Sequence, residues 1–229
     1  MRVRDPLLVA LFLVAASCSG DSATDDDTGT SRDGGVVRDS GIVEGGACER
    51  FVVFYDLAGS QLEVRGVPGG NRTQDIGPGM MTIAYSVEGE ARAEGPATIL
   101  AHELLLDFEE SGVVTDIETY AGPNECGLST GMVTGSTLAW SSNLADHHAR
   151  GSVTCVADEF FCELIGLPKD MPQSRDQDQD FPLVAFTLTS TGFTSDFVQI
   201  DDGGNIGDTF IKLVGSETSS ACVPLPSGC

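Results

Sequence analysis

The sequence predicts an all-β fold, either an antiparallel β-sandwich or an up-and-down β-barrel of about ten short strands, stabilised by disulfides. Apolar and polar residues alternate with a period of two in many short runs after residue 47, which is typical of half-buried strands. Turn-forming residues separate these runs, and six of the seven cysteines follow residue 47. Because the alternation is the same in both architectures, the choice between sandwich and barrel stays open.

The first strands of the domain are predicted before residue 90. Residues 51–56 and 61–67 are expected to pair as a hairpin through a turn at 57–60. The clearest alternation in the chain runs from Met81 to Val87. It predicts a half-buried strand at residues 81–88.

Residues 98–110 have good helix propensity, so helix and strand compete there. The acidic residues near the end of this segment would lie at the negative end of a helix dipole. Every second residue from Leu100 to Phe108 is apolar, except for His102, and this spacing places all of them on one face of a strand. We therefore expect a strand that returns antiparallel as residues 113–120.

The second half of the domain continues the β pattern. Further strands are expected at residues 132–140, 152–161, 183–190, 197–200 and 208–214. Turns are expected at 143–150 and 201–205. Residues 166–182 contain several prolines and an alternating Asp/Gln run, and they are predicted to form a surface loop.

The N-terminal residues predict export. Arg2 and Arg4 precede an apolar run at residues 7–16, which reads as a signal peptide at 1–17. This run is shorter than the roughly 20 residues that a membrane-spanning helix needs. An ordinary cleavage site after Ser17 would leave one of the seven cysteines unpaired, whereas removing Cys18 from the thiol count leaves six that can pair.

Residues 14–18 (Val-Ala-Ala-Ser-Cys) resemble the lipobox of bacterial lipoproteins, except that Ala15 stands where the family usually has leucine. The resemblance implies lipidation of Cys18, which becomes the first residue of the mature chain. It also implies delivery to the outer membrane, because Ser19 rather than aspartate follows the cysteine. Residues 18–47 are rich in Asp, Gly, Ser and Thr and are predicted to form a flexible acidic tether. A single β domain is expected at 48–229.

The formal net charge of −23 falls mostly after residue 47. A polyanion repels phosphate backbones and anionic membrane surfaces, so nucleic-acid binding is not expected. The expected partners are the membrane, through the lipid anchor, and a protein or small-molecule ligand.

All cysteines after the tether are expected in disulfides, since exported domains use them in this way. They are Cys48, Cys126, Cys155, Cys162, Cys222 and Cys229. Two prolines between Cys222 and Cys229 favour a local bridge there. Cys155 and Cys162 are too far apart to bridge along an extended strand. They need a bend near residues 157–158, or they pair elsewhere.

The one motif that suggests catalysis is Gly127-Leu128-Ser129-Thr130-Gly131, which matches the G-x-S-x-G pattern of esterases. That mechanism needs the serine on a turn between a strand and a helix, with a histidine as base. A β pattern follows the motif here. We therefore expect a structural segment and keep Ser129 only as a candidate nucleophile.

One histidine cluster and two acidic segments could bind metal ions. Asp146, His147 and His148 would offer zinc or copper ligands if they lie in a loop. Side-chain oxygens in two acidic segments could bind calcium if each segment curves around the ion. The first segment contains Asp176, Asp178 and Asp180, and the second contains Asp201, Asp202, Asn205 and Asp208. Ordinary solvated loops or turns are the alternative for all three. No other cofactor is expected.

These observations favour a non-catalytic, lipid-anchored β domain of the bacterial cell envelope that acts by binding or as structural material. The alternative is a carrier of a small lipophilic ligand, by analogy with calycin-like barrels that hold ligands in the lumen. A third reading is a secreted hydrolase that uses Ser129 with one of the histidines.

The lipid anchor can be tested directly. Labelled palmitate is expected to enter the wild-type protein and not a Cys18→Ser variant, because only Cys18 lies at the processing site. Equal incorporation into both proteins, measured by autoradiography of the purified chains, would contradict lipidation at Cys18.

Overall fold

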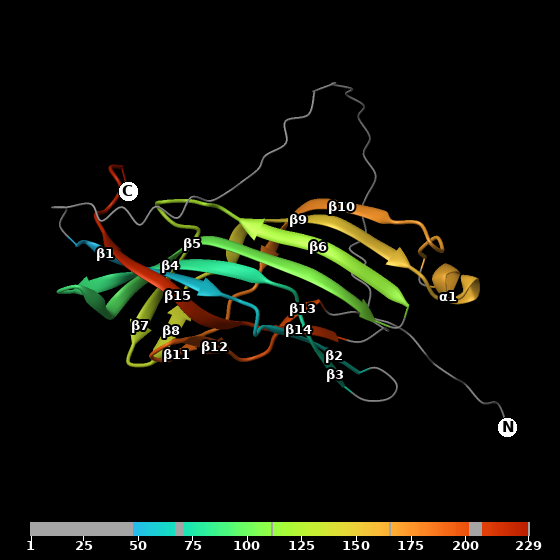
Figure 1. Ribbon diagram of the computed structural model, residues 1–229, viewed down its shortest axis with the longest axis horizontal. Helices are drawn as coiled ribbons and strands as arrows, with labels where there is room; N and C mark the ends of the chain where they lie inside the picture. The colour runs from blue at the N-terminus through green and yellow to red at the C-terminus, as the bar shows by residue number, and fades with distance from the viewer. Residues whose placement is uncertain (1–47, 67–70, 111, 165, 202–207, 229) are drawn as a thin grey trace, which may run out of the picture.

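The computed structural model describes residues 48–66, 71–110, 112–164, 166–201 and 208–228, and these residues are almost entirely β (Figure 1). They form fifteen strands and one six-residue helix. The described part of the chain contains no helix long and apolar enough to cross a membrane. The fold class predicted from the sequence is confirmed.

Eight strands close into an antiparallel barrel. Each barrel strand pairs with the next barrel strand along the chain, so that β5 pairs with β7. The last one, β15, returns to pair with β1. The barrel is therefore of the up-and-down type, with other strands inserted between its members. Its strands are β1 (Arg50–Asp56), β4 (Gly79–Glu88), β5 (Ala91–Glu110), β7 (Ser129–Thr134), β8 (Thr137–Trp140), β11 (Phe186–Leu188), β12 (Gly192–Ser195) and β15 (Val214–Val223).

Three inserted strands extend the barrel wall on one side. They are β6 (Val113–Ala121), β9 (Leu144–Cys155) and β10 (Gln173–Phe181), and they follow β5 in the order β5-β6-β9-β10. We call these strands, with the second half of β5, the wing. The 20-residue β5 belongs to both parts, because it pairs with β7 at Gly95–Ile99 and with β6 at His102–Glu110.

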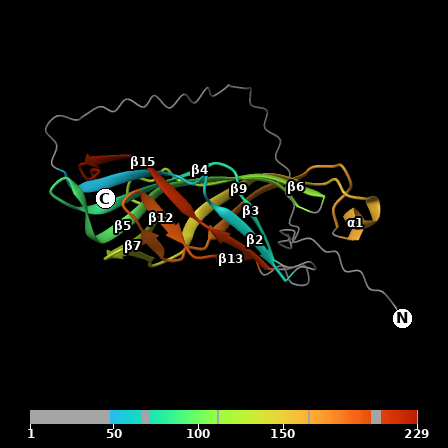
Figure 2. The same ribbon diagram turned by 60° about the horizontal axis from the view of Figure 1, so that its bottom comes forward.

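A second, four-stranded sheet covers the inner face of the wing. It contains β2 (Gln61–Arg65), β3 (Arg72–Asp75), β13 (Val198–Asp201) and β14 (Asp208–Lys212) in the order β13-β14-β2-β3. Figure 2 shows this sheet below the strands of the wing. Leu62 and Ile211 from the small sheet share one buried cluster with Leu104 and Ile117 from the wing. The barrel thus continues into a two-layered region with the same core.

Aromatic side chains fill much of the barrel interior. The rings of Phe186 and Phe193 stack with centroids 4.3 Å apart, and Tyr55 meets Phe193 edge-on at 5.0 Å. The hydroxyl groups of Tyr55 and Tyr85 are 2.8 Å apart. Gly215 lies against Phe193, where an added Cβ would overlap the phenyl ring. Close contacts of this kind are typical of a packed core.

The disulfides correct one sequence expectation. Cys222 bridges Cys48, not Cys229, because antiparallel pairing of β15 with β1 places Cys222 opposite Phe51. Cys126 is also disulfide-bonded; its partner and Cys229 lie outside the described residues.

Cys155 and Cys162 do bridge, with a Cα–Cα distance of 5.7 Å. The bend expected near residues 157–158 is present, between the end of β9 and helix α1 (Glu159–Leu164). The carboxylate of Asp158 accepts a hydrogen bond from the Phe161 backbone N–H at 2.9 Å and caps the helix. The strand expected at 152–161 therefore ends at Cys155.

Several local expectations were wrong because pairing is less local than assumed. The expected hairpin of residues 51–67 does not form, since β1 lies in the barrel and β2 in the small sheet. Residues 132–140 are two strands, with Gly135 in a turn at φ +58°. The expected turn at 143–150 is largely the start of β9, and the expected loop at 166–182 contains β10. Residues 202–205 of the expected turn at 201–205 lie outside the described residues.

The packing of Gly215 predicts a stability effect. Gly215→Ala should lower the free energy of unfolding by about 1–3 kcal/mol, because the new methyl overlaps the Phe193 ring inside the barrel. Urea unfolding would measure it. Ser216→Ala, at the exposed next position of β15, should change the stability by less than about 0.5 kcal/mol. Equal effects of the two changes would contradict the packing.

Candidate functional site

The outer face of the wing carries a set of aligned acidic side chains. Strand alternation directs one side chain in two away from the core, and in the wing these outward positions are often acidic. They are Glu103, Asp107 and Glu109 of β5, Asp116 and Glu118 of β6, and Asp176 and Asp178 of β10. We call this surface the acidic face.

The strand register places these carboxylates in rows across the sheet. Glu118 lies opposite Arg150, and Asp107 lies directly opposite Asp116. Opposite charges at facing positions stabilise an antiparallel pair, whereas like charges at facing positions destabilise it. Asp107 and Asp116 therefore disfavour the pairing of their two strands.

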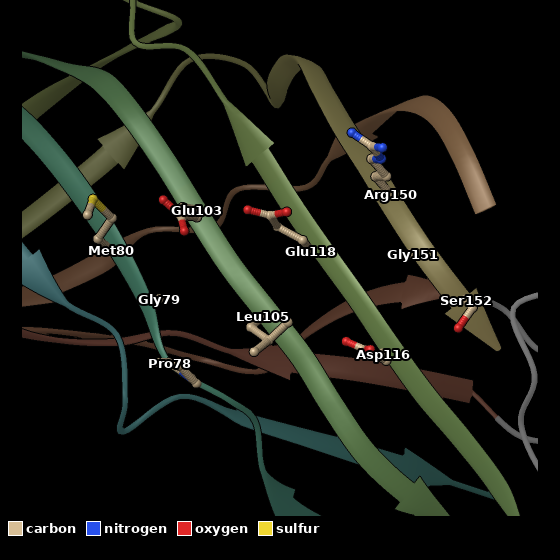
Figure 3. Close-up of a pocket in the computed structure, with 10 residues that line it drawn as sticks. All are labelled: Pro78, Gly79, Met80, Glu103, Leu105, Asp116, Glu118, Arg150, Gly151 and Ser152. Carbon is tan, nitrogen blue, oxygen red and sulfur yellow. The ribbon is translucent and has the colours of Figure 1, made fainter. Parts of the chain in front are cut away.

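Apolar side chains lie among the carboxylates. Met80 is 47% exposed and Tyr120 37% exposed, and both lie opposite Glu103 in the register. Figure 3 shows Met80, Glu103, Leu105 and Glu118 around an open depression of about 550 Å³ on this face. The acidic face thus combines charge with exposed apolar contact area.

His148 joins β9 to β10 at the edge of the acidic face. Its Nδ1 lies 2.7 Å from a carboxylate oxygen of Asp178, and its Nε2 lies 2.8 Å from one of Asp176. Both ring nitrogens donate when the ring is protonated. The hydrogen bond to Asp178, followed by that to Asp176, raises the pKa of His148 above its ordinary value. The ring also lies 5.2 Å from that of Tyr120.

His147 lies on the opposite face of the same strand and is fully buried. Its Nε2 is 3.2 Å from Nδ1 of His102, and the ring of Phe181 packs against both imidazoles. Burial lowers the pKa of His102 to about 3 and that of His147 to about 4. Because residues 144–155 form a strand, the side chains of His147 and His148 lie on opposite faces and do not converge on one ion. The side chain of Asp146 lies outside the described ones.

The calcium loops expected from the sequence also differ in the structure. Asp176, Asp178 and Asp180 lie on the extended strand β10, where alternate side chains point the same way without curving around an ion. Asp201 ends β13 and Asp208 begins β14; Asp202 and Asn205 lie outside the described residues. Within the described parts of the chain, no group of three or more His, Cys, Asp or Glu side chains is placed to hold a metal ion.

Ser129 lies in strand β7, which is followed by strand β8 and not by a helix. Its side chain is buried, and its Oγ donates to the backbone oxygen of Ser142 at 3.1 Å. A serine nucleophile needs a histidine within hydrogen-bond reach. The described histidines contact one another, aromatic rings and β10 carboxylates, so the expected pairing with Ser129 is not formed among them.

Sequence reasoning missed a polar cluster inside the barrel. Tyr55 and Tyr85 are buried and hydrogen-bonded to each other, and burial raises the pKa of each. Arg92 lies 3.4 Å from the Tyr55 hydroxyl group and donates to the Thr189 backbone oxygen at 3.2 Å. The carrier reading needs an apolar cavity, but here aromatic and polar side chains occupy the interior.

The described residues define a disulfide-bonded all-β protein, an eight-stranded up-and-down barrel extended by a wing and a small second sheet. Comparison with known proteins finds no matching family model, no matching curated protein and no matching solved structure.

The His148 cluster predicts a pH dependence of stability. Because its pKa is raised in the folded protein, its contribution is fully present below about pH 6.5 and is lost as pH rises through the raised value. Asp178→Asn should lower the pKa of His148, measured by an NMR titration of the ring. It should also destabilise the protein more at pH 6 than at pH 9.

Asp180→Asn provides the matched control, because Asp180 lies two residues farther along the same strand. It should leave the titration of His148 nearly unchanged. If Asp178→Asn and Asp180→Asn shift the titration equally, the shift is a general field effect and not the contact described above.

Proposed function

We propose that this protein is an exported, lipid-anchored binding domain that presents its acidic face to a cationic protein partner. The barrel fold fits a binding or structural module in general terms. The single observation that carries the choice of binding is the acidic face itself. There, seven aligned carboxylates surround exposed Met80 and Tyr120 and half-buried Leu105, with Arg150 and His148 as the interspersed basic side chains.

The charge of this surface indicates the chemistry of the partner. Lysine and arginine side chains would enter between the carboxylates and relieve the repulsion between Asp107 and Asp116. Complementary charge mainly speeds association and selects the partner. The exposed methionine and tyrosine supply residue types that are enriched at protein interfaces. A basic protein segment with some apolar residues fits both features.

The arrangement of the molecule supports an anchored orientation. β1 begins and β15 ends at the end of the barrel opposite α1 (Figure 1), where the Cys48–Cys222 disulfide joins them. In this proposal a lipid at Cys18 in the outer membrane attaches to that end through residues 18–47. The wing, with its acidic face, then projects away from the attachment.

Neither a lipophilic carrier nor a hydrolase is supported by a comparable set of side chains. A lipophilic carrier would need space where Tyr55, Phe186 and Phe193 pack against one another. A hydrolase would need a base beside Ser129, whose hydroxyl group donates to Ser142. We therefore propose neither.

Binding of a fluorescent decalysine peptide tests the acidic face. The triple variant Glu103→Gln, Asp116→Asn, Glu118→Gln should bind it about tenfold more weakly than the wild-type domain, because the clustered carboxylates that attract the peptide are removed. Fluorescence anisotropy at fixed ionic strength would measure the dissociation constants.

A control variant with the same net charge separates the site from the overall field. Glu88, Glu90 and Glu125 are exposed acidic residues outside the wing, and changing all three to Gln should alter binding by less than about threefold. Equal losses in both triple variants would show that the peptide responds only to net charge, and would contradict the acidic face as the site.

A further inference from the structure

A buried pair of histidines lies where the barrel meets the wing. His102 comes from β5 and His147 from β9, and both side chains are almost fully shielded from solvent. Phe181, the last residue of β10, packs against both rings at centroid distances of 5.0 and 4.9 Å. The pair therefore connects three strands, one of which, β10, is the edge strand of the large sheet.

Only two of the four ring nitrogens of the neutral pair have a hydrogen-bond partner among the described residues. The two facing nitrogens, His102 Nδ1 and His147 Nε2, are 3.2 Å apart, so one must donate and the other accept. The remaining nitrogens, His102 Nε2 and His147 Nδ1, are buried without a hydrogen-bond partner among the described residues. Whichever tautomers form, one N–H and one lone pair stay unsatisfied, at a cost in stability.

Protonation makes this arrangement worse. One added proton puts a charge in a site shielded from water, and a second places two N–H groups face to face across the 3.2 Å contact. The doubly protonated pair cannot keep its hydrogen bond. The positive charges on the two rings also repel each other.

No described carboxylate offsets these charges. Around the pair, β4 contributes Met81, β6 contributes Ala121 and β10 contributes Phe181. The acidic side chains of the same strands, such as Glu103, point to the opposite, outer face. Among the described side chains, the charged groups that act on the pair are the histidines themselves: His147 acts on His102, and His148 acts on His147.

We propose that His102 and His147 form an acid-sensitive latch that holds the end of β10 against the barrel and releases it when both rings are protonated. Phe181 loses its packing when the rings turn towards water. Because β10 is an edge strand paired only with β9, its release breaks a single strand pairing. The barrel strands stay closed.

The direction of the pH effect follows from linkage. The folded pair stays neutral to lower pH than free histidine, so the stability of the closed latch is full above about pH 6.5 and falls as pH drops towards the lowered pKa values. His148 acts in the opposite sense on the outer face, where its protonated ring holds Asp176 and Asp178. The junction of β9 and β10 therefore has two opposing proton-linked contacts.

The latch does not depend on what the acidic face binds. It concerns only the attachment of β10. The two proposals meet at Asp176 and Asp178, which move with β10 and which belong to the acidic face. Loss of peptide binding without strand release, or the reverse, would separate them.

Hydrogen exchange of the wild-type domain tests the latch. Protection factors, corrected for the intrinsic effect of pH, would be measured by mass spectrometry at pH 7 and pH 4. Protection of residues 173–181 should fall about tenfold or more relative to residues 81–85 of the barrel, because the opened state binds more protons than the closed one. An NMR titration of the labelled ring nitrogens of His102 and His147 should follow the same pH course.

Two variants decide whether the pair is responsible. His102→Phe/His147→Phe removes both titrating rings with aromatic replacements and should keep the fall within about threefold. His148→Gln removes the neighbouring histidine and should retain the full fall.

Three results would overturn the latch. The first is an undiminished fall in the double variant, and the second is loss of the fall in His148→Gln. The third is a mismatch in the wild-type protein, where the rings protonate without β10 opening, or β10 opens while both rings stay neutral. This third comparison needs no variant, so it decides the matter even if the double variant does not fold.

Discussion

The fold depends on strand β5, because its two halves pair with different neighbours. β6 ends with Ala121 opposite His102, and the chain then returns to the same edge of β5. Asn124 N–H donates to the Leu100 oxygen at 2.8 Å, and Leu128 N–H donates to the Ile99 oxygen at 2.7 Å. Pairing with β7 begins at Ser129. One strand edge is thus divided near Leu100, with the barrel on one side and the wing on the other.

This division explains why both architectures left open by the sequence are represented. Where β7 pairs with β5, the sheet closes into a barrel around its own side chains. Beyond Leu100 the sheet stays open, so its inner face needs another cover. The small sheet of β2, β3, β13 and β14 provides it, and the two layers share a core. The acidic face is the outer side of this open region.

Strands with one buried face were the part of the fold that the sequence predicted well. The alternation at Met81, Ile83 and Tyr85 marked β4, and the same alternation correctly favoured strand over helix for β5. β10 was missed because its outward positions are aspartates and its inward positions, before Phe181, are polar too. Barrel closure and the Cys48–Cys222 bridge join residues 174 positions apart, and no local pattern contains that information.

The candidate site was only partly visible for the same reason. The sequence singled out His147, His148, Asp176 and Asp178, and the structure does bring His148 to both aspartates. They meet through the pairing of β9 with β10, which places His148 opposite Asp178. A loop assignment suggested metal binding, whereas the strand assignment separates the two histidines onto opposite faces. The partner of His147 is His102, 45 residues earlier in another strand.

The acidic residues of β10 also answer a structural need. An edge strand exposes unpaired backbone groups that invite another strand, and charged side chains oppose such pairing. A second copy of β10 aligned antiparallel with the first would bring Asp176, Asp178 and Asp180 of both copies close together. The repulsion opposes pairing of two such edges, and the same aspartates extend the negative charge of the acidic face up to the rim of the sheet. A partner that docks by charge must therefore be cationic, which a second copy of this chain is not.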